Sequence, residues 1–224
     1  MPLLWPISQS RQTLTASFRS SDYAITPSGG ASSLVCNAPA GVAKGDLLLG
    51  WITCLANGSF SIAPPPGWSA STSLLQNGGN NISCQLFAKI ATASEPGSYT
   101  FAFSASTNSI CEVLDYKNAS AISSPQTSIG ATSATSFAAP SVQTAYPDEI
   151  VLAMWCNADL YGTTSLPAGV TSRVDVNNPN VYQQSACGDY FGPTVPGSTS
   201  PGSASNPNAT YWVAVSTTVI NGYQ

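Results

Sequence analysis

Short runs rich in Val, Ile, Leu, Phe, Trp and Tyr recur from about residue 31 to the end of this sequence, and clusters of Gly, Pro, Asn and Ser separate them. No stretch keeps the apolar spacing of about three to four residues that an amphipathic helix requires. Short apolar runs between turn-forming clusters are typical of the strands of a β-sandwich. We predict strands at residues 34–38, 46–55, 69–75, 82–91, 99–104, 110–116, 149–157, 170–176, 181–191 and 210–220.

Two proline-containing segments interrupt this series, at residues 63–67 and 166–169. Proline fixes φ and has no N–H, and the glycine that ends each segment favours turn conformations, so neither segment can continue a β-ladder. We expect both segments to be turns that end a strand.

The scarcity of charge supports the same fold class. Only 7% of the residues are Asp, Glu, Lys or Arg, whereas about a quarter are charged in an average soluble protein. Ser, Thr, Asn, Gly and Pro take their place, and these residues form turns and polar strand faces. Helices of soluble proteins usually carry Lys, Glu and Arg on their outer face, so the composition favours β-structure.

The two halves of the sequence share a weak repeat, in which residues of the first half recur 101 to 104 positions later. The matched pairs are Pro39 with Pro140, Asp46 with Asp148, Trp51 with Trp155, Gly67 with Gly169 and Cys84 with Cys187. Residues 98–101 also match residues 210–213 if the second half carries an insertion. The proline-containing residues 192–208 are the candidate insertion, and we expect them to form an exposed loop.

These features predict a single antiparallel β-sandwich, of the jelly-roll or immunoglobulin-like kind, with a weak internal two-fold repeat. Each half alone has too few predicted strands to cover two inner faces, whereas the whole chain can bury a sizeable core. Residues 1–24 show neither alternation nor a helix-cap signal. We therefore divide the chain into an N-terminal arm at residues 1–24 and a β-sandwich domain at residues 25–224.

The N-terminal arm has two interpretations. In the purely structural interpretation, the arm is an ordinary strand or a frayed end that covers the sandwich. In the functional one, the arm contacts a neighbouring subunit by apolar burial or by strand addition. The candidate subunit-contact residues are Leu3, Leu4, Trp5 and Arg11.

The residues that carry most enzyme chemistry are missing or unpaired. The sequence contains no His, which excludes Ser-His-Asp, Cys-His and His-metal arrangements. Glu112 and Asp115 are a near pair of carboxylates, but three positions along a strand place them on opposite faces. The six cysteines form no Cys-X-X-Cys motif, so we expect small buried hydrophobes, with cross-strand disulfides as the alternative. We expect no enzyme and no cofactor.

The charge pattern and the apolar runs also limit the partners. Six scattered basic residues and a net charge of −4 cannot form the positive surface that a phosphate backbone requires, so we expect no nucleic acid. The apolar run at residues 47–56 is too short to span a bilayer. Residues 1–7 lack the pattern of a secretory signal. We expect a protein that is made in the cytoplasm and does not enter a membrane.

Three segments carry a resemblance to a known module. Residues 39–49 (PAGVAKGDLLL), 66–68 (PGW) and 89–101 (KIATASEPGSYTF) are similar to a recurrent β-sandwich module of tailed-phage virion proteins, which also occurs in some bacterial surface proteins. The resemblance implies a component of the virion, assembled in the host cytoplasm. Its motifs are turns that flank strands, and they bring no catalytic residue to this chain.

Two virion roles follow from this resemblance. The first is a capsid decoration or cement protein, expected as a trimer, that binds the major capsid protein or other virion proteins. The second is a tail or fibre module that binds a host glycan, through residues 192–208 and through aromatic side chains near strand ends. Those aromatic residues are Trp68, Tyr161, Tyr182 and Tyr190.

Overall fold

The computed structural model describes residues 13–56, 58–79, 81–158, 162–178 and 181–223. Within these ranges every regular element is a β-strand, and every paired strand is antiparallel. The predicted all-β, antiparallel sandwich class is confirmed. Among the described residues no helix could cross a membrane.

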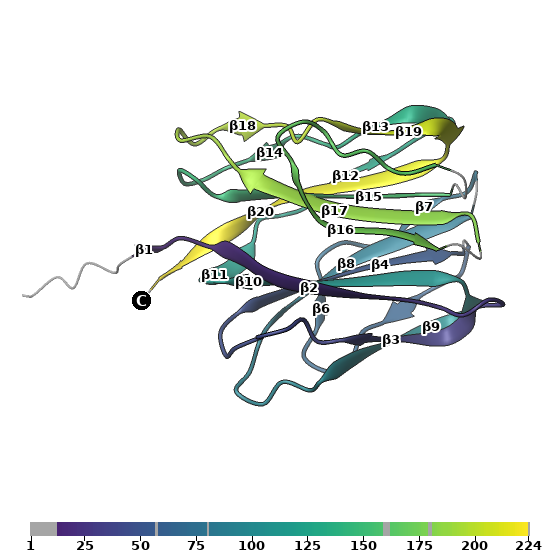
Figure 1. Cartoon of the computed structure of the whole chain (residues 1–224), viewed down its shortest axis with the longest axis horizontal. Coiled ribbons are helices and arrows are strands. Elements are labelled where there is room, and N and C mark those ends of the chain that lie inside the picture. Colours follow the sequence, from purple (N-terminus) through teal and green to yellow (C-terminus); the bar gives the residue numbers. More distant parts are fainter. Residues whose placement is uncertain (1–12, 57, 80, 159–161, 179–180, 224) are drawn as a thin grey trace, which may run out of the picture.

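The strands form four stacked layers, which Figure 1 shows from the side. The first large sheet has the order β2-β10-β4-β8-β6, with β7 also paired to β8. Its strands are β2 (Ser17–Ile25), β4 (Leu47–Leu55), β6 (Ser69–Ala70), β7 (Leu75–Asn77), β8 (Ile82–Ile90) and β10 (Ser109–Lys117). The first outer sheet covers it with β3 (Ala31–Asn37), β9 (Ser98–Thr107) and β5 (Ile62–Ala63).

The second large sheet has the order β1-β20-β15-β17-β16, and β11 and β12 also pair with β20. Its strands are β1 (Thr13–Leu14), β11 (Ala119–Ile122), β12 (Gln126–Ile129), β15 (Ile150–Asn157), β16 (Thr171–Asn178), β17 (Gln183–Phe191) and β20 (Trp212–Tyr223). Two strand pairs form the second outer layer. They are β13 (Ala134–Ala138) with β19 (Ser203–Thr210), and β14 (Val142–Gln143) with β18 (Ser198–Thr199).

Three apolar cores separate the four layers, because successive side chains of a strand point to opposite faces. In β4, Leu49 and Trp51 lie in the central core between the two large sheets. Leu48 and Ile52 lie in the first outer core, beneath the first outer sheet. The second outer core, beneath β13 and β19, contains Trp155. Strand β4 is thus buried on both faces, which explains its nearly continuous apolar sequence.

The weak sequence repeat corresponds to a structural one. Residues 17–117, the first repeat, form a large sheet whose order β2-β10-β4-β8 returns as β12-β20-β15-β17 in residues 119–223, the second repeat. Matching hydrogen bonds accompany the matching order. Leu55 N donates to Asn108 O at 2.9 Å, and Ala158 N, 103 positions later, donates to Tyr211 O at 3.3 Å.

The two predicted proline turns are also equivalent. Trp68 N donates to Pro65 O, and Val170 N donates to Pro167 O. The glycine before each donor has a positive φ, 84° for Gly67 and 87° for Gly169. A type II turn requires positive φ at its third position, so glycine is needed at both places.

The repeats pack around an internal pseudo-two-fold axis. Strand β10 of the first repeat contacts β16 and β17, and its counterpart β20 contacts β7 and β8. Such a reciprocal exchange of contacts is the signature of an isologous, two-fold interface. The central core is therefore built like the interface of a homodimer within one chain.

Structural equivalence shifts part of the sequence match by one residue. Asp148, at φ 56°, takes the place of Gly45, at φ 91°, and the equivalent strands β4 and β15 each begin two residues later. The carboxylate that closes the preceding loop is Asp46 in one repeat and Glu149 in the other, since they accept hydrogen bonds from Ala43 N and Ala145 N.

Two regions differ from the expected organisation. Residues 192–208 were expected to be an exposed insertion, but they contain β18 and most of β19, and Ala204 and Asn206 are buried. Their small and polar residues gave no apolar signal because the outer face of this layer meets solvent. The β-structure also begins at Thr13, ahead of the expected domain boundary at residue 25, because β1 and β2 belong to the large sheets.

Candidate functional site

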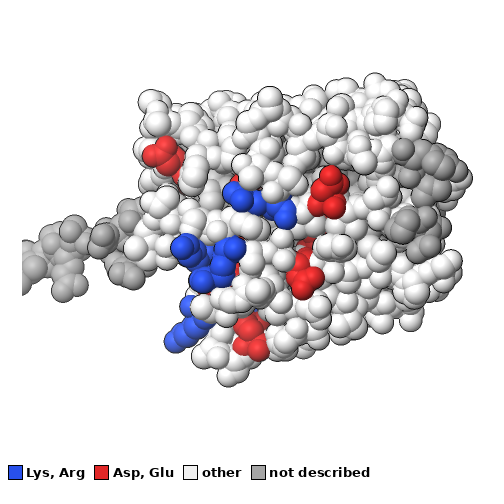
Figure 2. Space-filling view, viewed as in Figure 1, with Lys and Arg blue, Asp and Glu red and all other residues white. Residues whose placement is uncertain are grey.

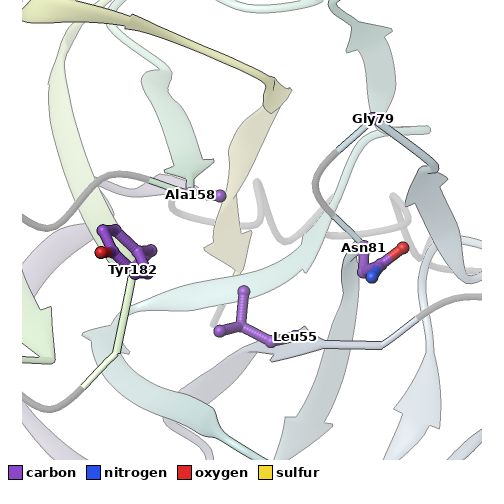
Figure 3. A pocket seen from close by; sticks show the side chains of 5 residues that line it. All are labelled: Leu55, Gly79, Asn81, Ala158 and Tyr182. Carbon is purple, nitrogen blue, oxygen red and sulfur yellow. The ribbon is translucent and has the colours of Figure 1, made fainter.

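A hollow of about 450 Å³ opens at one end of the two large sheets, and we call it the end hollow. Figure 3 shows side chains of both repeats around it. Leu55 and Ala158 are equivalent residues that follow or end equivalent strands, so the hollow lies close to the pseudo-two-fold axis. The lining residues are Leu55, Gly79, Asn81, Ala158 and Tyr182.

The described residues that line the end hollow are uncharged. Tyr182 is 54% exposed and offers an aromatic face with a polar tip. Asn81 has a φ of 54°, a left-handed conformation that Asn tolerates better than most residues. An amide and an aromatic ring beside small apolar groups suit a neutral polar ligand.

A second and larger hollow, about 610 Å³, lies on the first outer sheet, and we call it the proline groove. One wall is Ala63 at the end of β5 and the proline turn after it, the other is Pro96 and the first half of β9, and Lys89 reaches in from β8. The lining residues are Ala63, Pro64, Pro65, Pro66, Lys89, Pro96, Ser98, Tyr99, Thr100 and Ala102.

An ion pair closes the floor of the proline groove. Lys89 Nζ lies 2.8 Å from Glu95 Oε2, and both side chains are about nine-tenths buried. Thr92 N and Tyr99 Oη donate to the same carboxylate at 2.6 and 3.0 Å. Burial opposes ionisation of Glu95, but these hydrogen bonds outweigh it and lower the pKa of Glu95. The groove therefore presents no net charge to a ligand.

Charged side chains gather where the edges of the two large sheets meet. Figure 2 shows basic and acidic groups side by side over β2 and β16 on an otherwise uncharged face. Arg19 bridges two carboxylates, with Nη2 3.0 Å from Asp46 and Nε 3.2 Å from Asp115. Burial, and then the charge of Asp46, raises the pKa of Asp115 to about 7 although Arg19 opposes the shift.

A related ion pair lies on β16 and β17. Arg173 Nη2 lies 2.7 Å from Asp189 Oδ1, and Tyr116 Oη donates to Asp189 Oδ2 at 2.8 Å. The Arg173 guanidinium also lies 4.4 Å from the centre of the Phe18 ring. Because Asp189 and the Phe18 ring already contact the Arg173 guanidinium, this side chain contributes to packing between the sheets and is poorly placed to bind an anion.

The carboxylates flagged in the sequence do not converge on a cleft. Glu112 is fully buried in the central core, where burial raises its pKa to about 7 despite a hydrogen bond from Cys187. Asp115 points to the other face of β10, as the strand geometry predicted. Neither hollow is lined by either carboxylate, so the two groups have no described route to a shared substrate.

The six cysteines are free and buried, which confirms the expectation of small buried hydrophobes. Burial raises the pKa of the thiols of Cys54, Cys84, Cys111 and Cys187, so these groups are poor nucleophiles. No group of three or more candidate metal ligands occurs among the residues that the structure describes.

The sequence-predicted contact residues Leu3, Leu4, Trp5 and Arg11 lie outside the described residues, and so does Tyr161. The other predicted aromatics separate: only Tyr182 lines the end hollow, and Trp68 is buried in the first outer core. Tyr190 Oη lies 3.0 Å from Thr199 Oγ1. Both hollows were missed in the sequence because each combines residues far apart along the chain.

Comparison with known proteins adds no relative, since no family model, no curated protein and no solved structure matches the chain.

Proposed function

We propose that this chain is a non-enzymatic structural protein of an assembled particle, and that it acts as a decoration or cement protein of a tailed-phage capsid. The virion assignment rests on the sequence resemblance. The structural part of the proposal rests on a difference between the two ends of the molecule. The chain enters the folded body at one end, and the end hollow opens at the other.

The observation that carries the proposal is the separation of the chain entry from the end hollow. Strand β1 pairs with the last residues of β20, and Gly222 packs against Asn118 just after β10. The end hollow lies by Leu55, at the opposite end of the neighbouring strand β4. Nine residues of strand span about 30 Å, so one end can attach while the other faces outward (Figure 1).

The interior of the protein suits a structural role. Three of the five described cations, Arg19, Lys89 and Arg173, pair with buried carboxylates, and the described residues that line the two hollows present no net charge. A protein of this kind stabilises a shell by mass action, because it binds the assembled lattice and not the free subunits. Many weak identical contacts on one lattice then add up to strong attachment.

The test is a count of copies per particle. Particles from producing cells would be purified on a density gradient, and the ratio of this chain to the major shell protein measured by quantitative mass spectrometry. We expect a fixed ratio near one copy, or one trimer, per lattice site, and regular density over the shell in cryo-electron microscopy. Absence of the chain from gradient-purified particles would refute the virion role.

The end hollow favours one alternative, a tail or fibre module that binds a neutral glycan. Tyr182 and Asn81 would contact the sugar by ring stacking and amide hydrogen bonds. A few copies at the tail would support this role over decoration. Binding of the isolated chain to host cells would then depend on Tyr182, and Tyr182→Ala would abolish it while the equally exposed Tyr23→Ala would not.

A further inference from the structure

The proline groove exposes an unpaired strand edge. Tyr99 and Phe101 turn their backbone groups toward β3, so Thr100 turns its N–H and C=O toward the side of β5. Strand β5 ends at Ala63, which pairs with Ala102. The register, if continued, would place Pro65 opposite Thr100, but Pro65 can donate no N–H and its carbonyl already accepts from Trp68 N.

The second repeat closes the corresponding place. Gly97 and Gly202 are equivalent, since their carbonyls accept from Ala38 N and Ala139 N. A Cβ on Gly202 would lie 3.1 Å from Pro167, whereas a Cβ on Gly97 would meet no atom within 4 Å. Ser205, the counterpart of Thr100, also exchanges backbone hydrogen bonds with Ser165, so among the described residues this strand edge is paired in the second repeat and open in the first.

The apolar surface continues beyond the proline groove. Lys89 also lines a hollow of about 320 Å³ between β8 and β11, which contains Leu47, Ile90 and Ile122. Ile90 is 46% exposed, which is high for a large apolar side chain next to a groove. Together the two hollows provide an open strand edge with apolar surface on both sides of Lys89.

Residues 1–12 of the chain have the chemistry of a matching occupant. Leu3, Leu4 and Trp5 are apolar and each has a backbone N–H, and Pro2 and Pro6 flank them. Such a segment can add as a strand only three residues long, because proline donates no ladder hydrogen bond. The groove has the same short extent, and neither the segment from Met1 to Ile7 nor the groove carries net side-chain charge.

Distance decides which copy supplies the segment. The chain enters the body at Thr13 in the second large sheet, and the first large sheet separates it from the first outer sheet. Two sheet spacings amount to about 20 Å, and residues 6–12 span at most about 25 Å when fully extended. The segment of the same copy would have to be taut, whereas a neighbour's segment meets no such limit.

We propose that the proline groove binds residues 3–5 of a second copy of this chain, which pair with Thr100 as an added strand of the first outer sheet. The proposal deepens the assembly role above and rests on it in that copies of the chain must meet. The bond between copies is backbone pairing, and burial of Leu3, Leu4 and Trp5 against the prolines stabilises it.

The test is disulfide trapping between full-length chains. A chain with Leu4→Cys and a differently tagged chain with Thr100→Cys would be co-expressed, oxidised with glutathione disulfide and resolved without reductant. We expect a covalent heterodimer of two 23.0-kDa chains. The matched control is Ser203→Cys, an exposed residue of β19 that lies near the closed counterpart, and it should give at least tenfold less dimer.

Each other outcome overturns the proposal. No heterodimer, or equal yield with Ser203→Cys, would exclude the groove as the binding site. A link that forms only when Leu4→Cys and Thr100→Cys share one chain would show that each copy binds its own segment. A chain present on particles without the trapped dimer would refute this inference but leave the decoration role intact.

Discussion

Cys187 Sγ lies 2.6 Å from Glu112 Oε2, so a thiol of the second repeat donates a hydrogen bond to a carboxyl group of the first repeat. Both side chains are fully buried in the central core. The other oxygen of the carboxyl group, Oε1, has no hydrogen-bond partner among the described residues. Burial therefore favours the protonated form of Glu112, since ionisation would bury an undercompensated charge, although the hydrogen bond from Cys187 opposes this shift.

The first prediction concerns Glu112→Gln and pH. Burial raises the pKa of Glu112 from 4.5 to about 7, so the folded state holds its proton more tightly than the unfolded state does. The contribution of Glu112 to stability is therefore complete below about pH 4.5 and declines as the pH rises through about 7. The neutral glutamine should match the wild type at pH 4.5 and exceed it by on the order of 3 kcal/mol at pH 8.

Urea unfolding at pH 4.5, 6 and 8 would measure this difference. The matched control is Glu95→Gln, for which the lowered pKa predicts the opposite sign, with stability lost above about pH 5. A constant difference between wild type and Glu112→Gln across the pH range would contradict the expected protonation of Glu112.

The second prediction concerns the shared cation Arg19. It lies between Asp46 and Asp115, and the Asp115 side chain is fully buried while that of Arg19 is 31% exposed. Arg19→Met should cost about 2 kcal/mol at pH 8, toward the low end for a broken buried pair because Arg19 is partly solvated. Adding Asp115→Asn should recover at least half of the loss, since it removes the buried charge.

Thermal unfolding of the two single variants and the double variant would give the coupling between Arg19 and Asp115. The losses in unfolding free energy of the two single variants should sum to more than the loss of the double variant. Simple additivity would mean that the contact in the folded protein contributes nothing.

Strands that are buried on both faces were predictable from the sequence, and so were β3, β9 and β16, which have one exposed face. The strands that were missed are short or consist mainly of small and polar residues. Leu47–Leu55 and Ile150–Asn157 are almost wholly apolar, so β4 and β15 were predicted within a residue or two. Strand β19, with the sequence SASNPNAT, buries few side chains and looks like a loop. The strands of the second outer layer therefore needed the structure.

The candidate sites were less predictable than the fold. Each hollow joins residues brought together by the packing of layers, such as Pro65 with Thr100 in the proline groove. The sequence repeat indicated a two-fold relationship, but it could not show that one repeat would close its groove at Gly202 and the other leave it open at Gly97.

The third prediction concerns the reactivity of the six thiols. All are buried, and burial raises the pKa of four of them, so the thiolate that reacts with disulfide reagents is scarce in the folded protein. The native protein should release less than about a tenth of its thiol signal with Ellman's reagent at pH 8 in the time that the unfolded protein reacts fully. Rapid reaction of even one native thiol would show local opening of a core.

The last prediction compares the two tryptophans that the sequence repeat matched. Their separation of 104 positions exceeds the structural offset of 103, and a shift of one residue along a strand reverses the face. Trp51 accordingly lies in the central core and Trp155 in the second outer core, and both are fully buried. Trp155 Nε1 donates to Phe137 O at 3.0 Å. Trp51 Nε1 has no acceptor among the described residues.

Phenylalanine at either position removes a similar volume but a different polar contact. Trp155→Phe loses a satisfied hydrogen bond and leaves the Phe137 carbonyl without that donor, whereas Trp51→Phe removes an N–H that was buried without a partner. Trp155→Phe should therefore be less stable than Trp51→Phe by about 1–2 kcal/mol in urea unfolding at pH 7. Equal losses would mean that Trp51 finds an acceptor in solution, and that hydrogen bonding does not distinguish the two cores.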